Sequence, residues 1–194
     1  MATTTYGPEE RRAMLALARE AIASALRRDF PPDTLDCPES LREKGACFVT
    51  LHRADGALRG CIGNLRAYEP LADNIVHNAI NAALQDPRFP PVASEAELEA
   101  LEIEISVLTP PERIAGPGDF ILGRHGIILQ RGGRSAVFLP QVAPEQGWDR
   151  ETTLAHLALK AGLAQDAWKG PGAELSVFQA IVFSEATEGQ GSQP

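Results

Sequence analysis

The residues best suited to chemistry lie in one short span, Leu-Arg-Gly-Cys-Ile-Gly at positions 58–63. A thiolate at Cys61 would be favoured by the positive charge of neighbouring Arg59, and a thiolate can act as a nucleophile. The simpler alternative is packing, because a small thiol fits a tight strand end between Gly60 and Gly63, whose missing side chains allow close backbone approach. The sequence leaves covalent catalysis, a non-covalent site role and packing open for Cys61.

Arg59 is suited to anion binding, because a guanidinium binds a carboxylate or phosphate through two parallel hydrogen bonds. A structural bridge from Arg59 to an acid such as Glu104 is an equal alternative. The span is no P-loop, since the lysine and the spacing of that motif are absent. We predict a small anionic ligand and assign five substrate-binding residues: Arg59, Gly60, Gly63, Thr50 and Arg88.

Acid–base partners for the thiol come from the histidines and one strand carboxylate. The four histidines are isolated from one another in the sequence, with no HExxH or paired spacing, so neither a metal site nor a cofactor is predicted. His125 stands next to a glycine at a strand entrance, and Glu104 could serve as a general base, although a strand carboxylate on a polar face is usually only solvated. The predicted catalytic set is Cys61, His52, Glu104 and His125.

Periodicity and turn residues predict the elements that must position these groups. Apolar residues at three-to-four spacing predict helices, and alternation or hairpin turns predict strands. Ser94 and Glu97 fit a capping box for a short helix, and Asp149 fits a helix cap. The predicted helices cover 8–28, 69–85 and 150–161, and the predicted strands cover 45–53, 57–62, 101–108, 126–131, 134–139 and 175–184.

The hairpin at Asp55-Gly56 decides which residues share a face. A two-residue loop would place Thr50 opposite Cys61 and His52 opposite Arg59. These four residues would then form one polar patch, while the apolar residues between them form core. A three-residue bulged loop would shift the register by one and break the grouping.

The second predicted helix, 69–85, has an unusual polar side. Amides and one imidazole replace the Lys and Glu that a solvated helix normally shows. The side is interpreted either as the border of a cleft or as an ordinary exposed polar face. Its residues are Asn74, His77, Asn78, Asn81 and Gln85.

A hairpin followed by a helix occurs twice, near 45–85 and near 126–162. The predicted fold class is therefore α+β, with two small two-layer α/β lobes, mainly antiparallel sheets and a cleft between the lobes. The lobes need not be contiguous in sequence. We predict a single domain over 9–185, with flexible tails at 1–7 and 186–194.

Composition excludes several classes of protein. The chain has 194 residues, 44% hydrophobic and 23% charged, which is ordinary globular composition. A net charge of -8 counts against nucleic-acid binding. Three cysteines without CxxC spacing predict reduced thiols and a cytoplasmic location. No charge-free run of about 18 apolar residues is present, so no membrane association is expected.

The six-residue span, together with later segments, closely resembles the AMMECR domain family, whose prokaryotic members are called AmmeMemoRadiSam system protein A. The resemblance covers roughly residues 9–185, and the span is specific in this combined setting. The further matching segments are Asp86-Pro87-Arg88-Phe89, the Glu104-containing strand with Ile105-Ser106-Val107-Leu108, His125-Gly126, Leu139-Pro140-Gln141-Val142, Gly147-Trp148 and Lys160-Ala161-Gly162-Leu163.

The resemblance implies a two-lobed α+β protein with the six-residue span at a functional site between the lobes. It also implies a role in a basic cellular process, with suggestions ranging over transcription, replication, repair and translation. Two partners are implied, a Memo-like protein, similar to non-haem dioxygenases, and a radical SAM protein. No established reaction comes with the family.

Two functional hypotheses from different classes follow. The first is an enzyme component that acts on a small anionic substrate or a modified macromolecule, with Cys61 as the thiol and Arg59 as the anion holder. The alternative is a non-catalytic binding module that docks a Memo-like or radical SAM partner. An RNA- or translation-linked factor is a third hypothesis, and the acidic charge counts against it.

Overall fold

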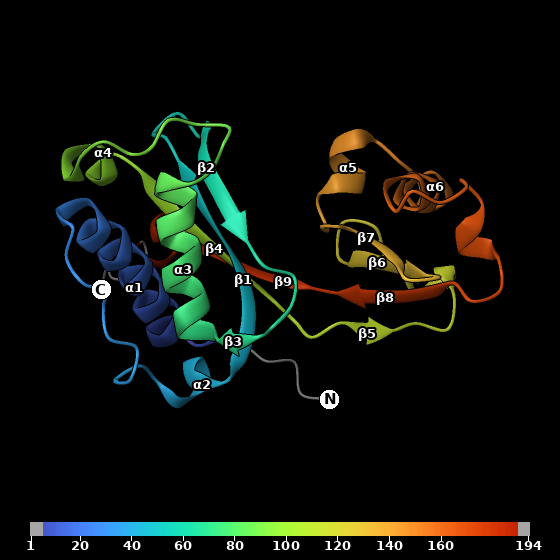
Figure 1. Cartoon of the computed structure of the whole chain (residues 1–194), viewed down its shortest axis with the longest axis horizontal. Helices are drawn as coiled ribbons and strands as arrows, with labels where there is room; N and C mark the ends of the chain where they lie inside the picture. Colours follow the sequence, from blue (N-terminus) through green and yellow to red (C-terminus); the bar gives the residue numbers. More distant parts are fainter. Residues whose placement is uncertain (1–5, 190–194) are drawn as a thin grey trace. The chain divides into compact units, whose positions relative to one another are not determined.

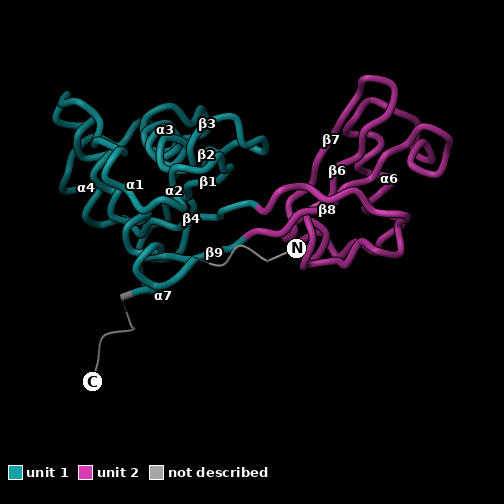
Figure 2. The backbone as a smooth tube through the Cα atoms, turned by 90° about the horizontal axis from the view of Figure 1, so that it is seen from below, with its two compact units in different colours: residues 1–108, 181–194 teal, residues 109–180 magenta. Residues whose placement is uncertain are grey.

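Two β-sheets, each with its own helices, make up the chain from residue 6 to residue 189, the part that the computed structural model describes (Figure 1). These elements form two compact units (Figure 2). The first unit reaches to Leu108 and resumes at Ile181, and the second is Thr109–Ala180. The predicted α+β class with antiparallel sheets is confirmed, whereas the cleft between the lobes stays a prediction.

The first unit has two layers, with α1 and α3 lying over one face of its sheet (Figure 1). The strand order is β2-β1-β4-β9, and β3 pairs with β1 beyond the end of β2. β1 is antiparallel to β2, β3 and β4. The elements are α1 (Pro8–Arg27), α2 (Glu39–Arg42), β1 (Lys44–His52), β2 (Leu58–Gly63), β3 (Glu69–Pro70), α3 (Leu71–Leu84), α4 (Glu95–Glu99), β4 (Glu102–Leu108), β9 (Ala180–Ser184) and α7 (Glu185–Gly189).

The core of the first unit fills the space between the helices and the sheet. Helix α1 begins at Pro8. The Glu10 side chain caps this end, because its carboxylate accepts from the Gly7 amide over 2.7 Å. The helix ends where Arg28 adopts a left-handed φ of 63°. Its apolar stripe meets that of α3 and the inward residues of the strands. Among the fully buried side chains are Met14, Ile22, Val49, Leu51, Ile75, Ile103 and Ile105.

The second unit has a separate core between a four-stranded sheet and its helices. The strand order is β5-β8-β6-β7, and the pairs are antiparallel. The elements are β5 (Glu112–Arg113), η1 (Pro117–Asp119), β6 (Gly126–Arg131), β7 (Arg134–Phe138), α5 (Val142–Gln146), α6 (Arg150–Lys160), η2 (Ala167–Lys169) and β8 (Glu174–Phe178). No helix among residues 6–189 is long and apolar enough to cross a membrane.

The last predicted strand, 175–184, is wrong as one strand. The strand is interrupted at Gln179, so that β8 belongs to the second sheet and β9 belongs to the first. At the break, the Gln179 amide donates to the Thr109 hydroxyl and the Thr109 amide donates to the Gln179 carbonyl, both over 2.8 Å. The apolar sequence runs through both strands without interruption, so it carries no sign of the change of sheet.

The structure describes part of the segments predicted as tails, and their flexibility stays a prediction. Tyr6 is 9% exposed, and residues 186–189 belong to α7. Helix α7 is tied to α1, because Arg19 makes two hydrogen bonds to the Glu185 carboxylate. Glu188 accepts a further bond from Arg11 over 3.3 Å. The remaining tail residues, 1–5 and 190–194, lie outside the described part of the chain.

The register of the β1–β2 hairpin agrees with the prediction at Cys61 and differs at Arg59. The Arg53 amide donates to the Ala57 carbonyl and the Gly56 amide donates to the Arg53 carbonyl, which closes a three-residue turn. Relative to the predicted two-residue loop, this turn displaces the strand pairing by one position. A bulge at Arg59 then restores it. Thr50 therefore pairs with Cys61 as predicted. The predicted pairing of His52 with Arg59 is wrong, because His52 lies opposite Leu58.

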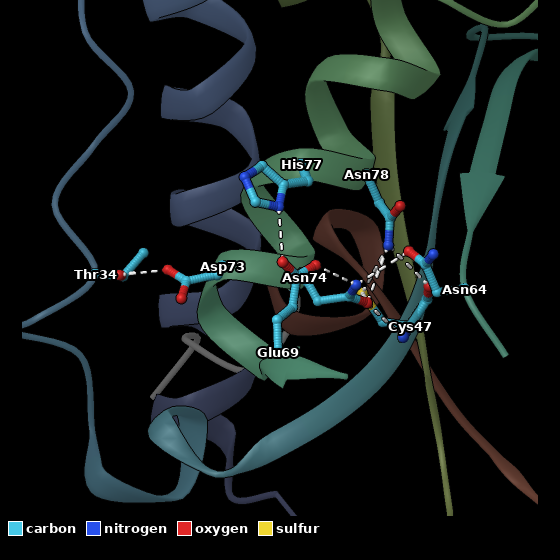
Figure 3. Close-up of polar contacts among 8 residues, drawn as sticks. All are labelled: Thr34, Cys47, Asn64, Glu69, Asp73, Asn74, His77 and Asn78. Atoms are coloured by element: carbon cyan, nitrogen blue, oxygen red, sulfur yellow. Dashed lines mark hydrogen bonds and ion pairs between the residues drawn. The ribbon is translucent and has the colours of Figure 1, made fainter. Parts of the chain in front are cut away.

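The two central amides of this side of α3, Asn74 and Asn78, are buried, so both interpretations, the border of a cleft and an exposed face, are wrong for these two residues, whereas His77 and Gln85 are exposed. Asn74 is 0% exposed and Asn78 is 2% exposed. The Asn74 carboxamide accepts from the Cys47 amide over 3.0 Å, and Asn78 donates to the Cys47 carbonyl over 3.1 Å (Figure 3). Asn74 also donates to Asn64 and to Glu69, which contacts His77 (Figure 3). These side-chain amides form hydrogen bonds with the backbone of β1 at Cys47, beyond the point where its pairing with β2 ends.

We expect Gly60→Ala to lower the free energy of unfolding by about 2 kcal/mol, because overpacking a filled interior forces backbone shifts. A methyl group at Gly60 would overlap the carbonyl oxygen of Ala82 in α3. Urea unfolding followed by circular dichroism measures the change. Gly116→Ala is the control, since nothing lies within 4 Å of a methyl group there. Equal losses in the two variants would contradict this packing role.

Candidate functional site

Three of the four predicted catalytic residues meet on the face of the first sheet opposite α1 and α3. Cys61, Thr50 and Glu104 lie side by side across β2, β1 and β4. The Thr50 hydroxyl donates to the Cys61 sulfur over 3.3 Å. His52 is two residues further along β1, and its Nε2 lies 4.0 Å from a Glu104 carboxylate oxygen. We call these four residues the thiol face.

Exposure differs along the thiol face. Thr50 is 9% exposed, and Cys61 is partly buried. The side chains of His52 and Glu104 are 28% and 33% exposed. The face thus combines a fixed hydroxyl and a partly accessible thiol with an imidazole and a carboxylate that solvent reaches.

A loop fixes the outer edge of β2 at Cys61. The Asp86 carboxylate accepts from the Cys61 amide over 2.9 Å, and Arg88 donates to the Cys61 carbonyl over 3.2 Å. Arg88 also binds both Asp86 oxygens, over 3.0 and 2.7 Å. Asp86 is 4% exposed, and the Arg88 guanidinium holds the pKa of this carboxyl well below its usual range. The loop replaces a neighbouring strand and positions Cys61.

Arg59 is not on the thiol face. It is 3% exposed, and two of its nitrogens donate to one Glu97 oxygen over 3.0 and 2.8 Å. Its third nitrogen donates to the Pro90 carbonyl over 2.8 Å. The predicted shared face with Cys61 is therefore wrong. The structure uses Arg59 as a bridge, to Glu97 rather than to Glu104, and these contacts occupy the guanidinium predicted to hold an anion.

The two glycines of the span serve close packing within the chain. Gly60 lies against the Ala82 carbonyl, and Gly63 lies against the ring of Phe48. Their predicted substrate-binding role stays a prediction. His125 belongs to the second unit, where its Nδ1 accepts from the Ile121 amide over 3.2 Å; its catalytic role also stays a prediction.

The three thiols differ in their surroundings. Cys47 is fully buried, and burial raises its pKa to about 12. Burial also raises the pKa of Cys37. Cys61 alone among them accepts a hydrogen bond from a hydroxyl group. The thiolate, which is the reactive form, is therefore disfavoured at Cys47 and Cys37.

Sequence reasoning missed Asp86 and Glu97 as partners of the span. Asp86 had a local signal, since an Asp often accepts a hydrogen bond from the amide two residues on, as Asp86 does from Arg88 over 3.1 Å. Glu97 had only its place in a capping box, in which its amide donates to Ser94. Among residues 6–189, no group of three or more His, Cys, Asp or Glu could hold a metal ion.

Comparison with known proteins places this fold and span in a family. The AMMECR1 family model matches residues 15–183, and the chain belongs to that family. Protein MK0488 of Methanopyrus kandleri is 44% identical over 91% of this chain and 89% of its own length. A protein of Thermococcus gammatolerans is also 44% identical, over 89% of this chain and 88% of its own length.

A solved structure is similar over most of the chain. The crystal structure of the uncharacterized protein PH0010 from Pyrococcus horikoshii has a TM-score of 0.78 and 40% sequence identity, and the match covers 93% of each chain. None of these names states an activity. The comparisons therefore show the family.

We expect Glu97→Gln to lower the free energy of unfolding by about 3 kcal/mol, because it leaves the buried charge of Arg59 without a counter-ion. Urea unfolding provides the measurement. The control is Glu95→Gln. Glu95 lies in the same helix as Glu97, and its exposed ion pair is with Arg27 of α1. Losing that pair should lower the free energy of unfolding by less than about 1 kcal/mol. A small, equal effect in both variants would show that Arg59 is not held by Glu97.

Asp86→Asn should remove a pH-dependent part of the stability. The folded-state pKa of Asp86 is lowered from 3.8, so its contribution is complete above that value and is lost as the pH falls through the folded-state pKa. We expect wild type to exceed the variant by about 2 kcal/mol at pH 7, with the difference shrinking below pH 3.8. Urea unfolding of wild type and variant at a series of pH values from 7 downwards measures this difference. Asp36→Asn, at an exposed position, is the control. A pH-independent difference would contradict it.

Proposed function

We propose that the chain is a component of an enzyme system and presents Cys61 as a reactive thiol to a small anionic substrate or a modified macromolecule. The observation that carries the proposal is the Thr50 hydrogen bond to the Cys61 sulfur on the face that also holds the His52–Glu104 pair. The Thr50 hydroxyl therefore fixes the position of the sulfur on this face.

The thiol face contains the groups that a nucleophilic step requires. The sulfur forms a bond to an electrophilic carbonyl carbon of the substrate, and the thiol proton passes to the His52 imidazole. Glu104 stabilises the imidazolium that results. The leaving group departs with the bonding electron pair and takes the proton from His52. Diagonal neighbours on a sheet lie about 7–8 Å apart, so the substrate or one water must bridge Cys61 and His52.

Arg88 takes over the anion contact that the sequence assigned to Arg59. Its side chain is 54% exposed and it lies beside the Cys61 carbonyl. Asp86 neutralises part of its charge, but a guanidinium has five N–H donors, and those not used within the chain can reach an anionic group of a substrate.

A second candidate function, docking of a Memo-like or radical SAM partner, is favoured by apolar side chains on the same face of the first sheet as the thiol. Phe48, on β1, packs over Gly63. Val182, on β9, is 53% exposed and points away from the core that Phe183 enters. In this reading Cys61 is part of a contact surface. The net charge of -8 opposes an RNA-binding role.

Alkylation by iodoacetamide, followed for each cysteine by peptide mass spectrometry, separates the two candidates. We expect Cys61 to react first and Cys47 at least about a hundredfold more slowly, because thiolate content and access govern the rate. Thr50→Val should slow Cys61 about threefold to tenfold, the equivalent of about 1 kcal/mol.

Ser106→Ala is the matched control, since Ser106 lies on the same face of the sheet, opposite Phe48, and its loss should leave the Cys61 rate unchanged. If Cys61 reacts no faster than Cys37, or if Thr50→Val has no effect, the thiol is not activated. The docking candidate would then replace the enzymatic one.

A further inference from the structure

A pocket of about 400 Å³ lies in the second unit, between the first turns of α6 and the η2 turn. Its size is within the range of small-molecule sites. All of its lining residues belong to the second unit, so the pocket is independent of the thiol face. They are Glu151, Thr152, Ala155, Gln165, Asp166, Trp168 and Lys169.

The Lys169 ammonium already makes, inside this pocket, the contacts that a bound organic cation would make. The Lys169 ammonium lies 4.8 Å from the centre of the Trp168 ring. It also lies 3.7 Å from a Glu151 carboxylate oxygen. An aromatic face and a carboxylate together are the usual surroundings of an organic ammonium in a protein site. The Lys169 side chain is 55% exposed, so its flexible stem can carry the ammonium away into solvent.

The aromatic side of the pocket is held by a fixed turn. Ala167, next to Trp168, is 6% exposed, and its carbonyl accepts from Arg131 over 2.5 Å. The Lys169 amide donates to the Asp166 carbonyl over 2.9 Å. The indole is therefore presented by an ordered turn, which reduces the conformational entropy that a ligand must remove on binding.

The charges of the pocket favour a cation over an anion. Glu151 and Asp166 contribute two carboxylates, against the single ammonium of Lys169. The start of α6 offers little to an anion, because Asp149 accepts from the Thr152 amide over 2.8 Å and occupies the capping position with its own negative charge. When the Lys169 side chain moves away, the remaining lining consists of an indole, an amide, a hydroxyl, a methyl group and two carboxylates.

We propose that this pocket binds an organic ammonium group, with Trp168 as the cation–π surface, Glu151 and Asp166 as counter-ions, and Lys169 as an internal competitor. The ammonium can come from a lysine side chain of another protein or from a free amine, since both present the same group. The proposal does not depend on the reactivity of Cys61.

The test uses N-acetyl-lysine N-methylamide and putrescine as probes, titrated into the full-length protein while the Trp168 indole N–H signal is followed by NMR. Trp168→Leu identifies that signal by its loss. We expect a saturable shift with the ammonium probes and none with the neutral N-acetyl-norleucine N-methylamide. Binding of the blocked lysine alone would point to a protein side chain, and binding of putrescine alone to a free amine.

The decisive variant is Lys169→Ala, because loss of the internal competitor should tighten probe binding about twofold to fivefold. Glu151→Gln should weaken binding by a similar factor. Glu145→Gln, in the neighbouring helix α5 and outside the pocket lining, is the control and should change nothing. All three positions are exposed, so the fold should tolerate these changes. Unchanged or weaker binding by Lys169→Ala, or equal binding of the neutral probe, would overturn the proposal.

Discussion

The register of β2 against β1 determines what the six residues at 58–63 can do, because each step along a strand sends the next side chain to the other face. The three-residue turn displaces the pairing by one position, and the extra residue at Arg59 restores it. Without that extra residue, Cys61 would pair with Val49 and face the core. The bulge therefore places the thiol on one face of the sheet and Gly60 beneath α3 on the other.

The bulge requires its own support, since it turns the guanidinium of Arg59 into the protein. A buried charge is costly without a partner, and α4 supplies that partner as Glu97. The Ser94 hydroxyl accepts from the Glu97 amide over 3.2 Å, and the Glu97 carboxylate accepts from the Ala93 amide over 2.9 Å. A helix of one turn is thus built around the carboxylate that holds the register of β2.

Much of the fold could be predicted from the sequence, because apolar periodicity and turn residues are local signals. The helix over Pro8–Arg27 follows from such signals. The predicted two-residue loop is wrong, and the pairing of Thr50 with Cys61 agrees with the prediction only because the bulge at Arg59 offsets the three-residue turn. The bulge, the Arg59–Glu97 bridge and the burial of Asn74 do not follow from local signals, because each depends on residues far away in the sequence. Whether an amide on a helix meets water or a strand depends on where the neighbouring strand ends, and no local pattern encodes that.

The thiol face is weakly specified by sequence for the same reason. Cys61 and Glu104 are brought together only by the shared neighbour Thr50 in the central strand. In the sequence, Arg59 suggests that the six-residue span binds an anion. In the structure, its guanidinium is already bound to the Glu97 carboxylate. The charged residue most easily noticed in the sequence is therefore structural.

Most positions of the span have a structural role. Arg59 forms the bulge, Gly60 admits the Ala82 carbonyl, and Gly63 admits the ring of Phe48. Ile62 packs against the core of the first unit. The backbone of Cys61 is also fully used, by Asp86 and Arg88. Its sulfur lies on the helix-free face, as the exposed side chain of Leu58 does, and accepts a hydrogen bond from the Thr50 hydroxyl. Arg59 and Cys61 are the two residues of the span whose side chains can do chemistry, and Glu97 already holds Arg59, so our proposal for the span rests on the Cys61 sulfur.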